Sequence, residues 1–168
     1  VNDASKIEVG QAQYSAMALE SGCVVDDLLI YRFADRYMLV VNASNLAKDL
    51  AWIRQHAQSY DVRIEDESDQ TGLLALQGPA AREILRPLAN PNVDEVTYYR
   101  FVEGQVAGLP AIISGTGYTG EDGFELYVAA RDAPAIWDAL LAGGSSAGLI
   151  PTGLGARDSL RLEMGYAL

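Results

Sequence analysis

Apolar and polar positions alternate in short blocks along the chain, and their spacing switches between a strand period and a helix period. Residues 28–32 and 37–41 are rich in β-branched and aromatic side chains and flank a polar turn, which predicts a β-hairpin. Apolar residues then recur every three to four positions as far as His56, which predicts a helix capped by Ser44 or Asn45. The N-terminal part therefore combines antiparallel strands with one helix.

The same patterns continue on both sides of an expected joint at Thr71-Gly72. Residues 62–64 form an expected short strand before this joint, and we interpret the acidic run 65–69 as a solvated turn. Glycine and proline mark the ends of the elements that follow. In chain order these are a strand at 73–76, a helix ending at Leu85, strands at 98–106, 111–114 and 124–128, a helix over 132–141 and a helix from 156 onward.

This order of elements predicts an α+β fold with antiparallel sheets and flanking helices. From residue 72 onward, the order of strand, helix, three strands and helix is close to the ferredoxin-like arrangement. We expect two subdomains, residues 1–71 and residues 72–168. A chain of 168 residues suits one large domain or two small ones.

Composition and charge narrow the classes of partner. Hydrophobic residues make up 49% of the chain and charged residues 21%, which is ordinary for a globular protein. The 23 acidic and 12 basic residues give a net charge of −11, so we expect neither nucleic acid nor an anionic membrane as a partner. No apolar run reaches the roughly 18 residues of a membrane-spanning helix, and we expect no signal peptide.

Cys23 is the one cysteine and His56 the one histidine of the chain. A single cysteine cannot form an intrachain disulfide, which favours a reducing cytoplasm, and we expect Cys23 to be a buried thiol. Two such ligands are too few for a structural zinc site, so we expect no metal. Because the chain starts without methionine and ends within a helical pattern, we expect it to be part of a longer polypeptide.

The loop 115–125 is the most distinctive segment, because it places four glycines among a tyrosine and three acids. It lacks the lysine of a P-loop and the helix that follows a dinucleotide-binding turn, and its acids would repel phosphate. Carboxylates suit instead a neutral or cationic heterocycle with N–H donors. Glu125 is the best candidate because it begins a strand, and a salt bridge or plain solvent exposure is the alternative.

Three further features are candidates for ligand binding. Arg157 lies in the first turn of the last expected helix, where it attracts either an anionic ligand or an acid such as Asp158. Asp26 and Asp27 precede a strand whose neighbours point to opposite faces, so one carboxylate faces inward as a site candidate, unless the pair only forms a turn. Four tyrosines beside expected turns can stack on a flat ring or be ordinary surface residues. They are Tyr14, Tyr98, Tyr99 and Tyr118.

Six segments carry a resemblance to a known family, and they occur along the chain in the same order as in that family. The two specific ones are GYTGEDGFE at 117–125 and GLGARDSLRLE at 153–163. The weaker ones lie at 9–15, 26–28, 41–43 and 74–79. Together they span nearly the whole chain, which resembles the T-protein of the glycine cleavage system, a tetrahydrofolate-dependent aminomethyltransferase.

The resemblance implies a part of a three-domain fold that holds folate in a central hole. It also implies a reaction in which the lipoyl arm of H-protein delivers an aminomethyl group, ammonia leaves, and the one-carbon unit passes to tetrahydrofolate. Asp27 matches the family's key aspartate, Glu125 the carboxylate that binds the pterin N–H groups, and Arg157 a folate-site arginine. The residues that match the lining of the folate pocket are Tyr14, Asn42, Tyr98, Tyr99 and Tyr118.

The resemblance leaves one departure and three alternatives. The family usually has an arginine two residues before Gly117, where this chain has Gly115, so either the strand packs differently or a surface ion pair is missing. The alternatives are a folate-dependent demethylase or folate module of a dimethylglycine or sarcosine oxidising enzyme, a non-enzymatic folate-binding protein, and a non-catalytic fragment with a folate half-site. The absence of a Lys-Gly-Cys signature near 117–123 argues against the second. The resemblance implies the bacterial cytoplasm, or the mitochondrial matrix in a eukaryote.

Overall fold

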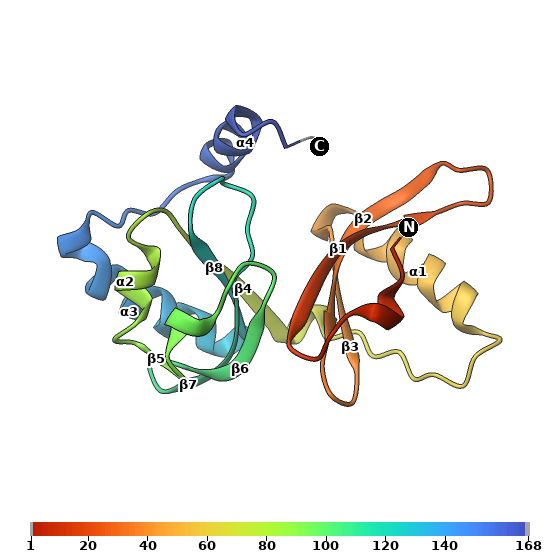
Figure 1. Cartoon of the computed structure of the whole chain (residues 1–168), viewed down its shortest axis with the longest axis horizontal. Helices are drawn as coiled ribbons and strands as arrows, with labels where there is room; N and C mark the ends of the chain where they lie inside the picture. Colours follow the sequence, from red (N-terminus) through yellow and green to blue (C-terminus); the bar gives the residue numbers. More distant parts are fainter. Residues whose placement is uncertain (1, 167–168) are drawn as a thin grey trace. The chain divides into compact units, whose positions relative to one another are not determined.

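The computed structural model describes residues 2–166, and the chain divides into two compact units, Val1–Asp66 and Glu67–Leu168. Each unit combines an antiparallel sheet with helices, which confirms the expected α+β class (Figure 1). The expected joint at Thr71-Gly72 lies at the start of strand β4.

The first unit is built on a three-stranded sheet in the order β1-β2-β3. The expected hairpin is confirmed, since Leu28 pairs with Val41 and Arg32 with Tyr37. Strand β1 pairs along β2 on its other edge and was not recognised in the sequence. The elements are the 3-10 helix η1 (Ala4–Lys6), β1 (Gln11–Ala18), β2 (Val24–Arg32), β3 (Tyr37–Val41), the 3-10 helix η2 (Ala43–Asn45) and helix α1 (Leu46–Ala57).

Helix α1 covers one face of this sheet. Leu28 and Ile30 of β2 line a hollow together with Trp52 and Ile53 of α1. Successive strand residues point to opposite faces, so Asp26 shares the helix-covered face with Leu28, and Asp27 points to the other. The two neighbouring carboxylates are thereby separated into different surroundings.

The second unit has a five-stranded sheet in the order β4-β8-β7-β6-β5, in which every neighbouring pair is antiparallel. It differs from the ferredoxin-like arrangement because the glycine-rich loop, and not a helix, joins β7 to β8. As in the ferredoxin-like arrangement, the first strand pairs with the last and every neighbouring pair is antiparallel. The strands are β4 (Thr71–Gln77), β5 (Ala89–Asn90), β6 (Phe101–Val106), β7 (Leu109–Ser114) and β8 (Gly123–Ala129).

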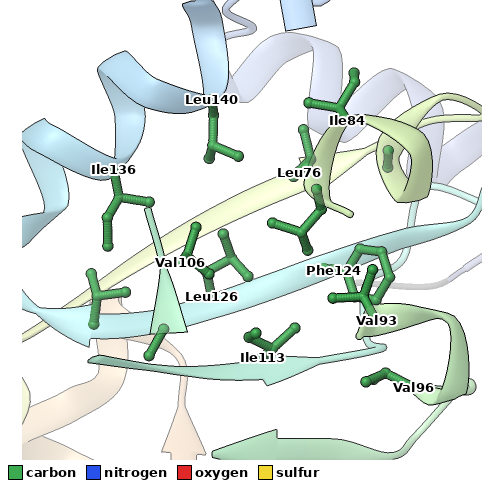
Figure 2. Packing of buried hydrophobic residues seen from close by; sticks show 14 residues of the cluster. Leu76, Ile84, Val93, Val96, Val106, Ile113, Phe124, Leu126, Ile136 and Leu140 are labelled. Atoms are coloured by element: carbon green, nitrogen blue, oxygen red, sulfur yellow. The ribbon is translucent and has the colours of Figure 1, made fainter. Parts of the chain in front are cut away.

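Helices α2 and α3 supply the apolar cover of this sheet. Figure 2 shows Ile136 and Leu140 of α3 above Leu126 of β8 and Val106 of β6, and Leu126 is fully buried. Burial of this apolar surface is the main stabilising term of the unit. Its helices are α2 (Ala81–Leu85), α3 (Ala133–Gly144) and α4 (Leu154–Glu163), with short 3-10 turns η3 (Ser68–Gln70), η4 (Val93–Glu95), η5 (Ala130–Asp132) and η6 (Ser145–Ala147).

Three details expected from the sequence are wrong. Residues 62–64 form no strand, because Val62 is exposed and no neighbouring strand pairs with it. The strand expected from 98 begins only at Phe101, since Tyr99 has a positive φ of 60° that ends extended backbone. Cys23 is exposed in the turn between β1 and β2, not buried.

Candidate functional site

The candidate residues fall into two groups, one in each unit. Within the first unit, the structure brings Tyr14 and Asn42 directly onto Asp27. The other candidates belong to the second unit and surround the glycine-rich loop 115–122. They are Tyr98, Tyr99, Tyr118, Glu125 and Arg157.

The carboxylate of Asp27 is held by two donors from the neighbouring strands. Asp27 lies opposite Ala16 of β1, two residues beyond Tyr14 on the same face. Tyr14 Oη donates to Asp27 Oδ2 over 2.7 Å. Asn42, which directly follows β3, donates from Nδ2 to Asp27 Oδ1 over 2.5 Å. Both oxygens are therefore oriented, and a carboxylate with about four lone-pair positions still accepts further hydrogen bonds.

Electrostatics keep Tyr14 in the donor role. The hydrogen bond to Asp27 raises the pKa of Tyr14 to about 12, with burial and the charges of Asp27 and Asp26 acting in the same direction. Tyr14 therefore remains protonated at physiological pH. Its ring is half exposed, which leaves an aromatic surface beside the carboxylate.

Asp26 is the inward carboxylate that the strand alternation predicted, and it supports the same site from behind. It accepts hydrogen bonds from Asn45 Nδ2 at 2.7 Å, Asn42 Nδ2 at 3.0 Å and the backbone N–H of Asp27 at 3.0 Å. Burial acts to raise the pKa of Asp26, but hydrogen bonds from Asn45, Asp49 and Asn42 outweigh it and lower the pKa to about 2. Asp26 is thus a stable anion one residue from Asp27.

In the second unit, the side chain of Gln77 closes the glycine-rich loop. Its Nε2 donates to the carbonyl oxygens of Thr116 (3.0 Å) and Phe124 (3.2 Å). A Cβ atom at Gly117 or Gly123 would come within 2.4–2.5 Å of the Gln77 amide, and Gly117 also has a φ of +148°. A side chain at either position would displace the Gln77 amide, and the backbone conformation of Gly117 also favours glycine.

Glu125 lies on the β8 face opposite to the apolar core, because Phe124 and Leu126 on either side of it point into that core. Its side chain is only 7% exposed. Thr116 Oγ1 and Tyr127 Oη both donate to Oε2, the latter over 3.4 Å. No described residue donates to Oε1. Burial raises the pKa of Glu125, and the hydrogen bonds from Thr116 and Tyr127 partly oppose this.

Aromatic residues flank the loop. Tyr98 is exposed and meets Tyr99 edge to face, with ring centroids 4.6 Å apart. Tyr98 Oη also donates to the carbonyl oxygen of Gly117 over 3.4 Å. Burial raises the pKa of Tyr98, and the charges of Tyr166 and Glu125 add smaller effects in the same direction. The guanidinium of Arg157 lies 5.8 Å from the ring centre of Tyr118 and donates to Asp158 over 3.3 Å. The ion pair with Asp158 is therefore present, but because both side chains are exposed it contributes little stability.

Gly115 explains why the turn with Tyr98 and Tyr99 lies so close to the loop. A Cβ atom at Gly115 would lie 2.4 Å from the carbonyl oxygen of Thr97. The backbone N–H of Tyr99 donates to the carbonyl oxygen of Gly115 over 2.9 Å. Glycine at position 115 is therefore the residue that fits this close approach of Thr97.

Sequence reasoning found Tyr14 and Asn42 beside Asp27 but missed the residues that contact Glu125, the glycine-rich loop and Asp26. Tyr127 carried a usable signal, because it lies two residues from Glu125 on one strand and hence on the same face. Gln77, Thr116 and Asn45 carried none, since their contacts depend on strand register and loop closure. Within residues 2–166, no cluster of three His, Cys, Asp or Glu side chains could hold a metal ion, and no helix has the length and apolar character to cross a membrane.

Comparison with curated proteins finds close relatives of this chain. The aminomethyltransferase of Halalkalibacterium halodurans is 52% identical over 164 residues, which are 96% of this chain and 45% of that protein. The aminomethyltransferase of Chloroherpeton thalassium is 51% identical over 168 residues, which are 99% of this chain and 46% of that protein. The chain thus spans somewhat less than half the length of these relatives.

Solved structures and a family model agree with this. The glycine cleavage system aminomethyltransferase T from Bartonella henselae matches 99% of this chain and 44% of its own, with 38% identity and a TM-score of 0.87. A model of the GCVT N-terminal domain matches residues 1–168. The expected fold, a part of the T-protein fold, is therefore confirmed, and the chain belongs to the GCVT N-terminal domain family.

Proposed function

We propose that the protein carrying this chain is an aminomethyltransferase of the glycine cleavage system. It takes the aminomethyl group from the lipoyl arm of H-protein, passes the one-carbon unit to tetrahydrofolate and releases ammonia. The observation that carries this proposal is the carboxylate of Asp27, held in place by Tyr14 and Asn42 while still able to accept a further proton donor. The identity of 52% to an aminomethyltransferase over nearly the whole chain supports it.

Glu125 suits the pterin ring of the folate substrate. A pterin presents N–H donors along one edge, and Glu125 Oε1 accepts nothing from the described residues. Because the carboxylate is buried, each hydrogen bond from a ligand offsets part of the cost of its dehydration. We assign Tyr98, Tyr99 and Tyr118 to the ring surfaces of the substrate. Arg157 suits its anionic portion.

Asp27 suits the reacting nitrogens. Two C–N bonds to the transferred carbon form on tetrahydrofolate, the C–N bond to ammonia and the C–S bond to the lipoyl group break, and the two folate N–H protons pass to the leaving nitrogen and sulfur. A carboxylate that accepts a hydrogen bond from a folate N–H orients that nitrogen and stabilises the positive charge that develops on it. Tyr14 and Asn42 keep Asp27 pointed toward the substrate. No metal takes part in this proposal.

The proposal is tested by two variants in an H-protein-dependent assay. We expect Asp27→Asn to lower kcat by at least about 100-fold, as for removal of a group that stabilises the charge developing in the reaction. We expect Glu125→Gln to weaken tetrahydrofolate binding by roughly 10- to 100-fold, the loss of a charged hydrogen bond, with a smaller effect on kcat. Asp138→Asn, at an exposed position of α3, is the control. An unchanged rate for Asp27→Asn, with an unchanged unfolding temperature, refutes the assignment.

The alternative of a sarcosine oxidising enzyme receives less support. The heterotetrameric sarcosine oxidase from Corynebacterium matches 87% of this chain and 69% of its own with a TM-score of 0.62, but at 20% identity this likeness concerns the fold alone. Lipoylated H-protein is accordingly the proposed partner. The proposed location is the bacterial cytoplasm, or the mitochondrial matrix in a eukaryotic host.

A further inference from the structure

Asp49, in the first turn of α1, is a buried carboxyl group that the proposed reaction does not use directly. Its side chain is completely buried, and neither oxygen receives a hydrogen bond from an N–H or O–H donor of the described residues. The nearest cation, Lys48, has its Nζ 3.7 Å from Asp49 Oδ1 and also donates to the carbonyl oxygen of Val25 over 2.6 Å. A carboxylate ion in such surroundings is costly, whereas a neutral carboxyl group is not.

Asp26 of β2 lies close to Asp49: Asn45, one helical turn before Asp49, donates to Asp26 over 2.7 Å, and Lys48 connects Asp49 to the carbonyl oxygen of Val25, the residue before Asp26. The hydrogen bond and charge of Asp26 accordingly raise the pKa of Asp49. Two neighbouring carboxyl groups are more stable when they share one proton than when both are ionised. The hydrogen-bond donors around each carboxyl group determine which of the two is ionised. Asp26 accepts three hydrogen bonds from Asn45, Asn42 and the Asp27 backbone, and Asp49 accepts none. When the pair holds one proton, that proton therefore favours Asp49.

The amide of Asn42 connects this pair to the other face of the sheet. Its Nδ2 lies 3.0 Å from Asp26 Oδ1 and 2.5 Å from Asp27 Oδ1. An amide nitrogen carries two protons, so one bond to each carboxylate uses both and prevents rotation of the amide. A displacement of Asp26 therefore displaces Asn42 from Asp27.

We propose that Asp49 donates a proton to Asp26, and that the resulting pair positions Asn42 against Asp27. Asp49 is then a positioning residue for the proposed transfer reaction. Its catalytic effect depends on that reaction, but the shared proton does not. Loss of the proton leaves two adjacent anions, whose repulsion moves Asp26 and loosens the bond between Asn42 and Asp27.

Burial and the surrounding charges determine the pH range in which Asp49 loses its proton. Burial, followed by the hydrogen bond and charge of Asp26, raises the pKa of Asp49 to about 6, and Lys48 opposes this. Asp27 and Tyr14 lie one hydrogen bond further away, on the opposite face. His56, the one imidazole of the chain, lies seven residues along α1, with its Nδ1 2.8 Å from the carbonyl oxygen of Trp52. The measurement must therefore report on Asp49 separately from this imidazole.

The first measurement is a ¹³C NMR titration of the protein labelled at aspartate carboxyl carbons. We expect one resonance with a midpoint near pH 6, absent in Asp49→Asn and retained in Asp138→Asn and His56→Gln. A resonance of Asp49 with the ordinary aspartate midpoint, near about pH 4, overturns the proposal. This result does not depend on whether the protein transfers aminomethyl groups.

The second measurement compares the rate profiles of two variants between pH 5 and 8. Asparagine at position 49 still offers an N–H to Asp26 and has no titrating proton, whereas alanine offers neither. We expect Asp49→Ala to lower kcat about tenfold more than Asp49→Asn, the worth of one hydrogen bond, with little change in the tetrahydrofolate KM. We also expect Asp49→Asn to lack the fall in rate that wild type undergoes as Asp49 loses its proton. Equal loss in both variants, or an unchanged profile in Asp49→Asn, overturns the positioning role.

Discussion

Replacement of Gly115 by alanine tests how the tyrosine turn and the glycine-rich loop fit together. The added methyl group would lie 2.4 Å from the carbonyl oxygen of Thr97 and 3.1 Å from its carbonyl carbon. Both are backbone atoms, and the same oxygen accepts a hydrogen bond from the N–H of Arg100 over 2.9 Å. No side-chain rotation relieves the overlap, so the backbone that carries Tyr98 and Tyr99 must move.

The size of the effect follows from that overlap. Ordinary contact at such a carbon begins at 3.4 Å, so a methyl group at 2.4 Å requires a shift of 1.0 Å. Forcing an extra methyl group into a packed region costs about 1–3 kcal/mol. Alanine also restricts the unfolded chain more than glycine does, and this stabilises the folded state by about 0.4–1 kcal/mol. We therefore expect a net loss of roughly 1–2 kcal/mol, which lowers the unfolding temperature of a unit of this size by roughly 5–15 °C.

Thermal unfolding followed by circular dichroism measures this loss. Gly155→Ala is the matched control, because Gly155 lies within α4 and nothing lies within 4 Å of its added Cβ atom. The control should unfold at the wild-type temperature or slightly above it, since alanine favours a helix. Equal unfolding temperatures for Gly115→Ala and Gly155→Ala would falsify the close approach of Thr97 to the loop.

Three further predictions concern the stability and the ligand contacts of single residues. Thr116→Val removes a hydrogen-bond donor from Glu125 and should raise the pKa of that carboxyl group further. As the pH falls, calorimetry should show tetrahydrofolate binding to the variant weakening at a higher pH than binding to wild type; an identical pH dependence contradicts this. Leu126→Ala, at a fully buried position, should cost about 2–5 kcal/mol in chemical denaturation, and a cost below about 1 kcal/mol contradicts its place in the core. Because the folded-state pKa of Asp49 is raised from 3.8 to about 6, its stabilisation is full below about pH 4 and is lost as the pH rises through 6, so Asp49→Asn should flatten the stability profile between these values; an unchanged slope contradicts it.

The strand period was the most informative signal in the sequence, because it determines faces without knowledge of partners. It separated Asp26 from Asp27, and the structure has the two on opposite faces of β2. The same alternation accounts for the position of Glu125 on the face opposite to Phe124 and Leu126, which face the core. Local sequence is sufficient for such conclusions because side-chain direction in a strand follows from backbone geometry alone.

Contacts between segments far apart in the chain could not be predicted from the local sequence. Gln77 reaches the loop at Thr116, 39 residues away, only because β4 pairs with β8 at the end of the sheet. The expected strand at 62–64 failed for the related reason that a β-like run needs a partner, and Val62 has none there. Strand pairing is a property of the fold, and no short window of sequence contains it.

Glu125 and Asp27 are both carboxylates, but their surroundings suit them to different tasks. Glu125 is 7% exposed, and burial raises its pKa, so a ligand that brings N–H donors stabilises its charged form and is bound in return. Asp27 is half-buried and already has a donor on each oxygen, so it holds its orientation before any substrate arrives. A carboxyl group such as Glu125, whose ionised form is stabilised by the bound ligand, is suited to binding a ring that does not react. A group whose position is set in advance is suited to the nitrogens at which bonds form, which is the role proposed for Asp27. We therefore expect the support of Asp27 by Asn42, Asp26 and Asp49 to matter most.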